Sequence, residues 1–221
     1  MSQEARRPRI TVVDYGAGNL VSIEQALTSV GATVTVARDA DALRDADAVV
    51  VPGVGAASPA MARLERRGLV EPIRAWIAAD RPFLGICLGL QLLFEGSDED
   101  GATTLGVVRG RTSRLVDAPT LPHIGWNQVI RTREHPLFDG IADGADLYFV
   151  HSYAGVPAAE AKDTILAWTD HGRPFVSALA RGRLLGVQFH PERSGTDGLR
   201  LLANFVGLVR AAAAAPAGVA A

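Results

Sequence analysis

The N-terminal part of the chain alternates short apolar runs with amphipathic stretches, and this alternation restricts the fold more than any other feature. Apolar runs bounded by turn residues are typical of buried strands, whereas apolar residues three and four apart indicate helices. Strands are expected at 9–13, 33–37, 48–51 and 82–86, and helices at 20–30, 59–67, 70–79 and 88–94. Strands connected by helices pair in parallel and are covered on both faces. The pattern therefore predicts an α/β three-layer sandwich of flavodoxin-like type with a mainly parallel central sheet.

The pattern changes from about residue 103, where strand-like runs predominate and turn signals containing glycine separate them. These runs lie at 126–131, 147–153, 165–169, 175–180 and 184–190, and a last helix is expected at 197–210. The sequence thus predicts one domain over residues 9–210, with antiparallel strands added in its second half. An alanine-rich tail at 211–221 is expected to be disordered.

Composition excludes several classes of protein. With 48% apolar and 21% charged residues, the chain of 221 residues lies in the globular range, so disorder is excluded for most of it. A formal net charge of −2 argues against a nucleic-acid surface built on overall positive charge. No apolar run reaches the roughly 18 residues of a membrane span, and no signal peptide is recognisable. We therefore expect no membrane association and a cytoplasmic location.

The chain has a single cysteine, Cys87, which excludes an internal disulfide and a zinc site built from several cysteines. No cluster of metal-ligand residues and no phosphate-binding glycine motif is visible, so neither a metal nor a cofactor is expected.

Cys87 stands between the expected strand at 82–86 and the helix at 88–94, in the segment Gly85-Ile-Cys-Leu-Gly89. Glycines two residues before and after a nucleophile are typical of a sharp strand-to-helix elbow, in which larger side chains would collide with the backbone. A helix N-terminus favours thiolate over thiol, and the N–H of Leu88 would face the group that the sulfur attacks. The alternative is a cysteine that only packs in the core, as most free cysteines do.

A nucleophilic cysteine needs a base, and the base needs a group that orients it. His190 ends an apolar run, and Glu192 follows two residues later, which places both side chains on one side of an extended segment. Together with Cys87 they are expected to form a triad of nucleophile, base and orienting carboxylate. His151 is the other contender, but it lies on an aromatic strand and is expected to be a core or interface residue. The remaining histidines, at 123, 135 and 171, are expected at the surface.

Two of these segments, 85–91 (GICLGLQ) and 189–192 (FHPE), resemble the class I, triad-type glutamine amidotransferases. Four others narrow the resemblance to the glutaminase subunits of imidazole glycerol phosphate synthases: DYGAGN at 14–19, PGVG at 52–55, PHIGWN at 122–127 and YFVHSY at 148–153. The resemblance covers about residues 9–210.

The resemblance implies an activity and a partner. A glutaminase of this family hydrolyses L-glutamine to glutamate and ammonia through a thioester on the cysteine. The ammonia passes to a separate cyclase subunit, a (β/α)8 barrel, in a heterodimer. The cyclase joins it to a phosphorylated ribulosyl nucleotide and forms imidazole glycerol phosphate in histidine biosynthesis.

The resemblance also assigns roles to positions of this chain. It implies that Cys87, His190 and Glu192 form the catalytic triad. The oxyanion hole would use Val54, Gly55 and Leu88, and the substrate would be held by Gly53, Gln91 and Glu99. Asn19, Trp126 and Tyr148 would face the partner. Ala56 and Ala57 depart from the family pattern, in which a bulkier residue is common, so the support of the oxyanion loop is in question.

Several alternatives stay open from the sequence. Glu99 also fits one more carboxylate of an acidic surface run at 95–100. The triad would also suit a glutaminase that serves the synthesis of anthranilate, carbamoyl phosphate or pyridoxal phosphate, although the segments at 122–127 and 148–153 argue against these. It would also suit a hydrolase of γ-glutamyl or peptide bonds that has no partner. A flavodoxin-like binding protein with an inert cysteine belongs to a different class altogether.

Overall fold

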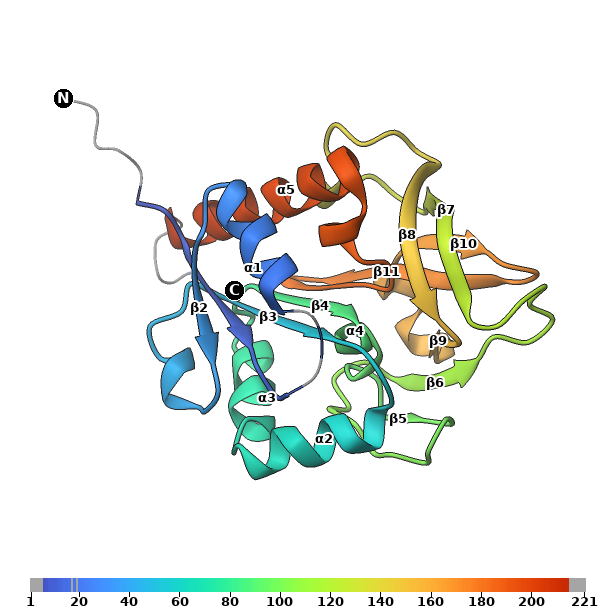
Figure 1. Ribbon diagram of the computed structural model, residues 1–221, viewed down its shortest axis with the longest axis horizontal. Coiled ribbons are helices and arrows are strands. Elements are labelled where there is room, and N and C mark those ends of the chain that lie inside the picture. The colour runs from blue at the N-terminus through green and yellow to red at the C-terminus, as the bar shows by residue number, and fades with distance from the viewer. Residues whose placement is uncertain (1–5, 17, 19, 215–221) are drawn as a thin grey trace.

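The computed structural model describes residues 6–16, 18 and 20–214 of the chain. Within this part, nine strands form one large sheet in the order β2-β1-β3-β4-β12-β11-β10-β7-β8 (Figure 1). The first five strands of this order are parallel, and the others pair antiparallel. The parallel strands are β2 (Thr33–Ala37), β1 (Arg9–Val13), β3 (Ala48–Gly53), β4 (Phe83–Cys87) and β12 (Leu184–Val187). The antiparallel strands are β11 (Pro174–Arg181), β10 (Ile165–Asp170), β7 (His123–Arg131) and β8 (Ala145–His151).

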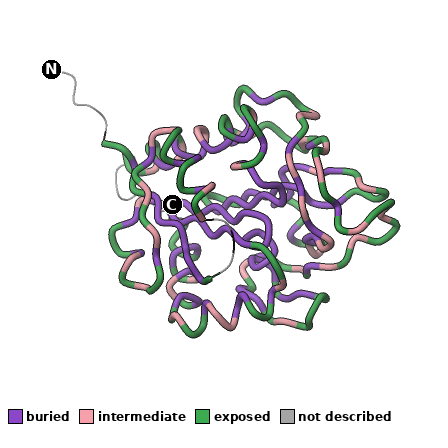
Figure 2. Tube along the Cα trace, in the orientation of Figure 1, coloured by how far each residue is buried: buried purple, intermediate pink, exposed green. Residues whose placement is uncertain are grey.

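Helices cover the parallel part of the sheet on both faces, as Figure 1 shows. Helices α1 (Leu20–Ser29) and α5 (Gly195–Ala214) pack on one face, and α2 (Ala57–Arg66) and α3 (Val70–Ala78) pack on the other. Strand β3 explains the two cores: Ala48 and Val50 join the core under α1 and α5, whereas Val49 and Val51 join the core under α2 and α3. A strand whose two faces are both buried reads as a continuous apolar run. The buried residues accordingly run through the middle of the molecule in Figure 2, and the predicted α/β sandwich is confirmed.

A second, smaller sheet lies beside the first and has the order β5-β6-β9 in the described part of the chain. Its strands are β5 (Gly96–Ser97), β6 (Gly110–Arg114) and β9 (Tyr153–Pro157). The first two were not expected, because they are short and lack an apolar run. The expected strand at 147–153 divides at Ser152, so that β8 belongs to the large sheet and β9 to the small one.

Two other expectations need correction. The helix after Cys87, α4, spans only Leu88–Gln91 rather than 88–94. The carbonyl oxygens of residues 92–94 instead accept hydrogen bonds from the N–H groups of the loop at 105–108. Helix α5 continues to Ala214, past the expected boundary at 210, because alanine favours helix. The rest of the expected disordered tail, 215–221, lies outside the described residues. None of the described helices is long and apolar enough to cross a membrane.

Candidate active site

Cys87 ends β4 and directly precedes α4, with backbone angles φ 54° and ψ −108°. A positive φ is costly for a residue with a side chain and persists only where the surroundings enforce it. Both flanking glycines are required by close contacts: a Cβ on Gly85 would lie 2.6 Å from the carbonyl oxygen of Gly89. A Cβ on Gly89 would overlap the carbonyl oxygen of Val51. The segment therefore forms the strained elbow that its glycine spacing predicts.

The pairing of parallel strands brings three segments together at one edge of the sheet. Gly53 at the end of β3 pairs with Cys87 at the end of β4, so the loop after β3 lies beside the elbow. On the other side of β4, Val187 of β12 pairs with Ile86, so the chain leaving β12 passes next to Cys87. Carboxyl ends of parallel strands are where open α/β folds place their sites.

His190 and Glu192 lie on the segment that follows β12. The N–H of His190 donates to the carbonyl of Tyr148 at 2.8 Å, and a 3-10 helix then covers Pro191–Arg193. Nδ1 of His190 and Oε1 of Glu192 are 2.8 Å apart, and the two side chains are only 7% and 9% exposed. Nε2 of His190 is buried and has no hydrogen-bond partner of normal geometry among the described residues.

The surroundings of His190 favour its protonated form. Burial is the largest influence and by itself lowers the pKa of this imidazole, but Cys87 and Glu192 outweigh it and raise the pKa of His190 to about 10. The proton therefore resides on His190 at neutral pH, where the carboxylate of Glu192 stabilises the imidazolium.

A cavity of about 260 Å³ opens in front of Cys87, near the lower end of the roughly 300–1,000 Å³ of small-molecule sites. It contains most of the residues predicted for the oxyanion hole and the substrate. Its lining residues are Val54, Gly55, Ala56, Cys87, Leu88, Gln91, Glu99, Pro122, Val150, His151, Ser152 and Tyr153. Gly53 is not among them; it lies beneath the loop, where a Cβ would overlap the hydroxyl of Tyr15.

The loop predicted to hold part of the oxyanion hole has its own support. Gly55 adopts φ +91°, with no described atom within 4 Å of a Cβ built on it, so the backbone angle alone favours glycine there. The small residue Ala57 is buried at the start of α2. The N–H of Ser58 donates to Oδ2 of Asp100 at 2.6 Å, which ties the first turn of α2 to the acidic segment.

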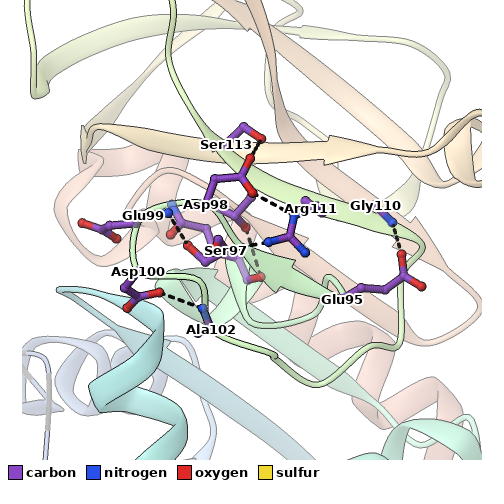
Figure 3. Close-up of polar contacts among 11 residues, drawn as sticks. Glu95, Ser97, Asp98, Glu99, Asp100, Ala102, Gly110, Arg111 and Ser113 are labelled. Carbon is purple, nitrogen blue, oxygen red and sulfur yellow. Dashed lines mark hydrogen bonds and ion pairs between the residues drawn. The ribbon is translucent and has the colours of Figure 1, made fainter.

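Within the acidic segment at 95–100, Glu99 differs from the other carboxylates in its contacts (Figure 3). Asp98 is engaged by Nε of Arg111 at 2.8 Å and by the hydroxyl of Ser113 at 2.5 Å. Glu95 accepts from the N–H of Gly110 at 2.9 Å. The carboxylate of Glu99, by contrast, lines the cavity and has no ion-pair partner in the described part of the chain. Partial burial, and then the charge of Asp100, raise the pKa of Glu99, so a cation in the cavity would complement it.

The far wall of the cavity comes from the turn between β8 and β9, which the sequence reasoning did not place at the site. His151 lines this wall instead of serving only in the core or an interface. His123 is 3% exposed, so its expected surface position is wrong. Pairing of β7 with β8 sets His123 opposite His151, and their Nδ1 and Nε2 atoms are 3.1 Å apart. The occurrence of two histidines at matching positions of strands that pair was the sequence signal for this contact.

Two of the residues predicted to face a partner, Trp126 and Tyr148, lie opposite each other on the paired strands β7 and β8. Trp126 of β7 is 56% exposed, and its ring contacts that of Tyr148 with centroids 6.0 Å apart. The guanidinium of Arg193 lies 4.1 Å from the centroid of the Tyr148 ring. Ile124, on the same strand, is also exposed. Asn19 lies outside the described residues.

Comparison with known proteins places this geometry in a family. A model of the family "Glutamine amidotransferase class-I" matches residues 11–208. The chain is 52% identical over 202 residues to "Imidazole glycerol phosphate synthase subunit HisH" of Chloroflexus aurantiacus, covering 89% of this chain and 94% of that protein. It is 50% identical over 198 residues to the protein of the same name from Symbiobacterium thermophilum, covering 89% and 92%.

Solved structures show the same fold at low identity. The structure of PurLQS from Thermotoga maritima superposes with a TM-score of 0.74 at 18% identity, covering 92% of this chain and 99% of that one. A second structure, described as a glutamine amidotransferase, gives a TM-score of 0.68 at 20% identity, covering 90% and 98%. The chain belongs to the class I glutamine amidotransferases, and within them to the family of HisH subunits of imidazole glycerol phosphate synthase.

Proposed function

We propose that the protein hydrolyses L-glutamine and passes the ammonia to the cyclase subunit of imidazole glycerol phosphate synthase. One observation carries the chemistry: Cys87 occupies a strained elbow in a cavity, beside a buried His190–Glu192 pair. The similarity to HisH subunits over most of the chain carries the choice of synthase.

The first half of the reaction forms a thioester. Sγ of Cys87 attacks the side-chain amide carbon of glutamine, and the carbonyl oxygen becomes an oxyanion. We propose that backbone N–H groups of Leu88 and of the loop at Val54 and Gly55 stabilise that charge, since all three residues line the cavity. The proton on His190 passes to the leaving nitrogen, which departs as ammonia when the C–N bond breaks.

The second half of the reaction regenerates the cysteine. Neutral His190 accepts a proton from water, which attacks the thioester carbon, and the C–S bond breaks to release glutamate. Glu192 stabilises the imidazolium each time it forms, because its Oε1 lies 2.8 Å from Nδ1. No step requires a metal or a cofactor.

We expect two side chains to recognise the amino-acid end of glutamine. Glu99 supplies an unpaired carboxylate for the ammonium group. Both N–H groups of Gln91 are used within the protein, one on the carbonyl of Tyr153 at 2.7 Å and one on Oε1 of Gln188 at 3.1 Å. Only the side-chain oxygen of Gln91 remains to accept a hydrogen bond from the substrate.

A partner fits the exposed aromatic surface beside the site. Trp126 and Ile124 are large apolar side chains on β7 that stay exposed in the isolated chain. We propose that they and Tyr148 contact the cyclase, a (β/α)8 barrel, in a heterodimer. We also propose a cytoplasmic location, because a thiol nucleophile stays reduced there.

The test is a glutaminase assay of the chain alone and then with the cyclase and its nucleotide ligand. We expect weak hydrolysis alone and strong stimulation in the complex, because free ammonia would waste glutamine. Cys87→Ala should abolish both activities. Full activity in isolation, unchanged by the cyclase, would contradict the proposal and favour a hydrolase without a partner. Stimulation by a different synthase subunit would retain the glutaminase and reject the partner.

A further inference from the structure

A buried glutamine lies against the sulfur of Cys87, and neither the sequence motifs nor the mechanism above assigns it a task. Gln188 follows β12 directly, two residues before His190, and is 0% exposed. Its Nε2 lies 3.6 Å from Sγ of Cys87. A fully buried amide must have its polar atoms satisfied, so the direction in which it points is determined by its neighbours.

The carbonyl oxygen of Tyr153 determines that direction. A carbonyl only accepts, so the side-chain atom of Gln91 at 2.7 Å from it must be the NH₂ group. The second hydrogen of the same NH₂ group points to Gln188 at 3.1 Å, so the atom of Gln188 there must be the acceptor Oε1. The amide of Gln188 then has its NH₂ group facing Sγ of Cys87. A flipped amide would set two NH₂ groups against each other.

A histidine pair supplies the second hydrogen bond to the same carbonyl oxygen. Nδ1 of His151 lies 2.8 Å from the carbonyl oxygen of Tyr153 and must donate to it. Burial lowers the pKa of His151 to about 3, so the ring is neutral and its Nε2 can only accept, here from Nδ1–H of His123. Two donors therefore converge on one carbonyl, and each has its direction set by its own neighbours.

We propose that Gln188 is a positioning residue that holds the sulfur of Cys87 by an N–H donor whose direction is set by Gln91. The opposite neighbour of the sulfur, the carbonyl of Val150 at 3.9 Å, can accept from a thiol but opposes a thiolate. Gln188 supplies a neutral donor that stays in place when the proton moves to His190. Because Gln91 also lines the cavity, the wall that contacts substrate and the support of the nucleophile form one hydrogen-bonded unit.

Other titratable groups near the sulfur of Cys87 also influence the pH dependence of its reactivity. His190 faces it with Glu192 behind, and Tyr15 lies on the other side, where burial and Cys87 raise the tyrosine pKa. Glu99 borders the same cavity. The variants below leave these four groups unchanged. The inference relies on the proposed function only in treating Cys87 as a thiolate nucleophile, and its test reads the sulfur directly.

The single cysteine makes that reading unambiguous, because every alkylated thiol is Cys87. We would measure the rate of iodoacetamide alkylation of the full chain from pH 5 to 10 in the wild type and in Gln188→Met, which keeps length and burial but removes the donor. The midpoint of the profile should move about one unit to higher pH, and alkylation on the acid side of the midpoint should slow about ten-fold, as for a lost hydrogen bond to a charged group. Gln25→Met, the same change on the exposed face of α1, should leave the profile unchanged.

An unchanged profile in folded Gln188→Met would overturn the inference, whatever happens to glutamine turnover. Loss of turnover together with a shifted midpoint supports the inference. A substitution that only loosened the core would reduce turnover without moving the midpoint. A measurement on the wild type covers the case in which the variant does not fold. The side-chain amide resonance of Gln188 should shift with the same midpoint as alkylation and on alkylation itself. A resonance that stays still in both experiments overturns the inference.

Discussion

Oε1 of Glu192 lies 2.8 Å from Nδ1 of His190, in a site where both side chains are more than nine-tenths buried. A buried carboxylate at this distance sets the tautomer of the imidazole and stabilises its charge. Glu192→Gln keeps an acceptor but removes the charge, so we expect kcat for glutamine to fall about 10²-fold or more with little change in KM. Steady-state glutaminase assays of the complex would measure this. Glu65→Gln, on the exposed face of α2, should behave as wild type.

The raised pKa of His190, about 10, sets the alkaline limit of catalysis. Above it the imidazole no longer carries the proton that the leaving nitrogen needs, so kcat/KM should fall near pH 10 rather than near pH 7. An alkaline limb near the ordinary histidine value of about 6.5 would contradict the assignment.

The same pKa has a consequence for stability. A histidine whose pKa rises from about 6.5 in the unfolded chain to about 10 in the folded one contributes stability in full below pH 6.5 and loses it as the pH rises to 10. Between these values the folded state binds the additional proton. The free energy of unfolding in urea should therefore fall with pH more steeply in the wild type than in His190→Gln, by up to about 1.4 kcal/mol per pH unit. Parallel slopes would show that His190 is not protonated in the folded state.

Gly89→Ala should damage the elbow, because its Cβ would overlap the carbonyl oxygen of Val51 in the adjoining strand. Backbone must move to relieve the contact, so we expect a loss of about 3 kcal/mol or more in the free energy of unfolding, together with loss of glutaminase activity. Gly207→Ala is the matched control, since a Cβ there meets no described atom within 4 Å on helix α5. It should stabilise the protein by about 0.5–1 kcal/mol. Chemical denaturation of both variants would show whether their effects have opposite signs.

Glu99→Gln should separate substrate binding from chemistry. Removing the carboxylate that faces the ammonium group should raise KM for glutamine about ten-fold and leave kcat within about two-fold, since the reacting amide lies at the other end of the substrate. Glu24→Gln, on the exposed face of α1, makes the same change in net charge away from the cavity and serves as the control. If both variants retain the wild-type KM, Glu99 is only one more carboxylate of the acidic segment.

Trp126→Ala should weaken binding of the cyclase while preserving the fold, because the ring is exposed in the isolated chain. Truncation of a central aromatic residue commonly costs about 2 kcal/mol or more, which corresponds to a Kd about 30-fold higher. Isothermal titration calorimetry would measure the affinity. Val116→Ala removes an exposed apolar side chain elsewhere and serves as the control. Equal affinities for the two variants would move the interface away from β7.

Much of the architecture follows from local patterns. Strands buried on both faces, such as β1 and β3, are continuous apolar runs because helices cover them on each side. The elbow at Cys87 is recognisable because its glycines meet a steric requirement that no other residue satisfies. His190 and Glu192 are recognisable for a similar reason, since two residues separate them and a proline between them restricts the chain. These features can be predicted from the sequence because each depends on a few adjacent residues.

The remainder depends on which segments meet, and that is decided by sheet pairing over long separations. Strand order alone brings Gln188 to the sulfur of Cys87 and sets His123 opposite His151. The aromatic run at 148–153 is divided at Ser152, because β8 pairs with β7 whereas β9 pairs with β6. Local sequence patterns are enough to predict the sandwich, the elbow and the candidate triad. The cavity wall and the buried amide network depend on the folded chain, because the role of a buried polar side chain is set by the hydrogen-bond partners around it.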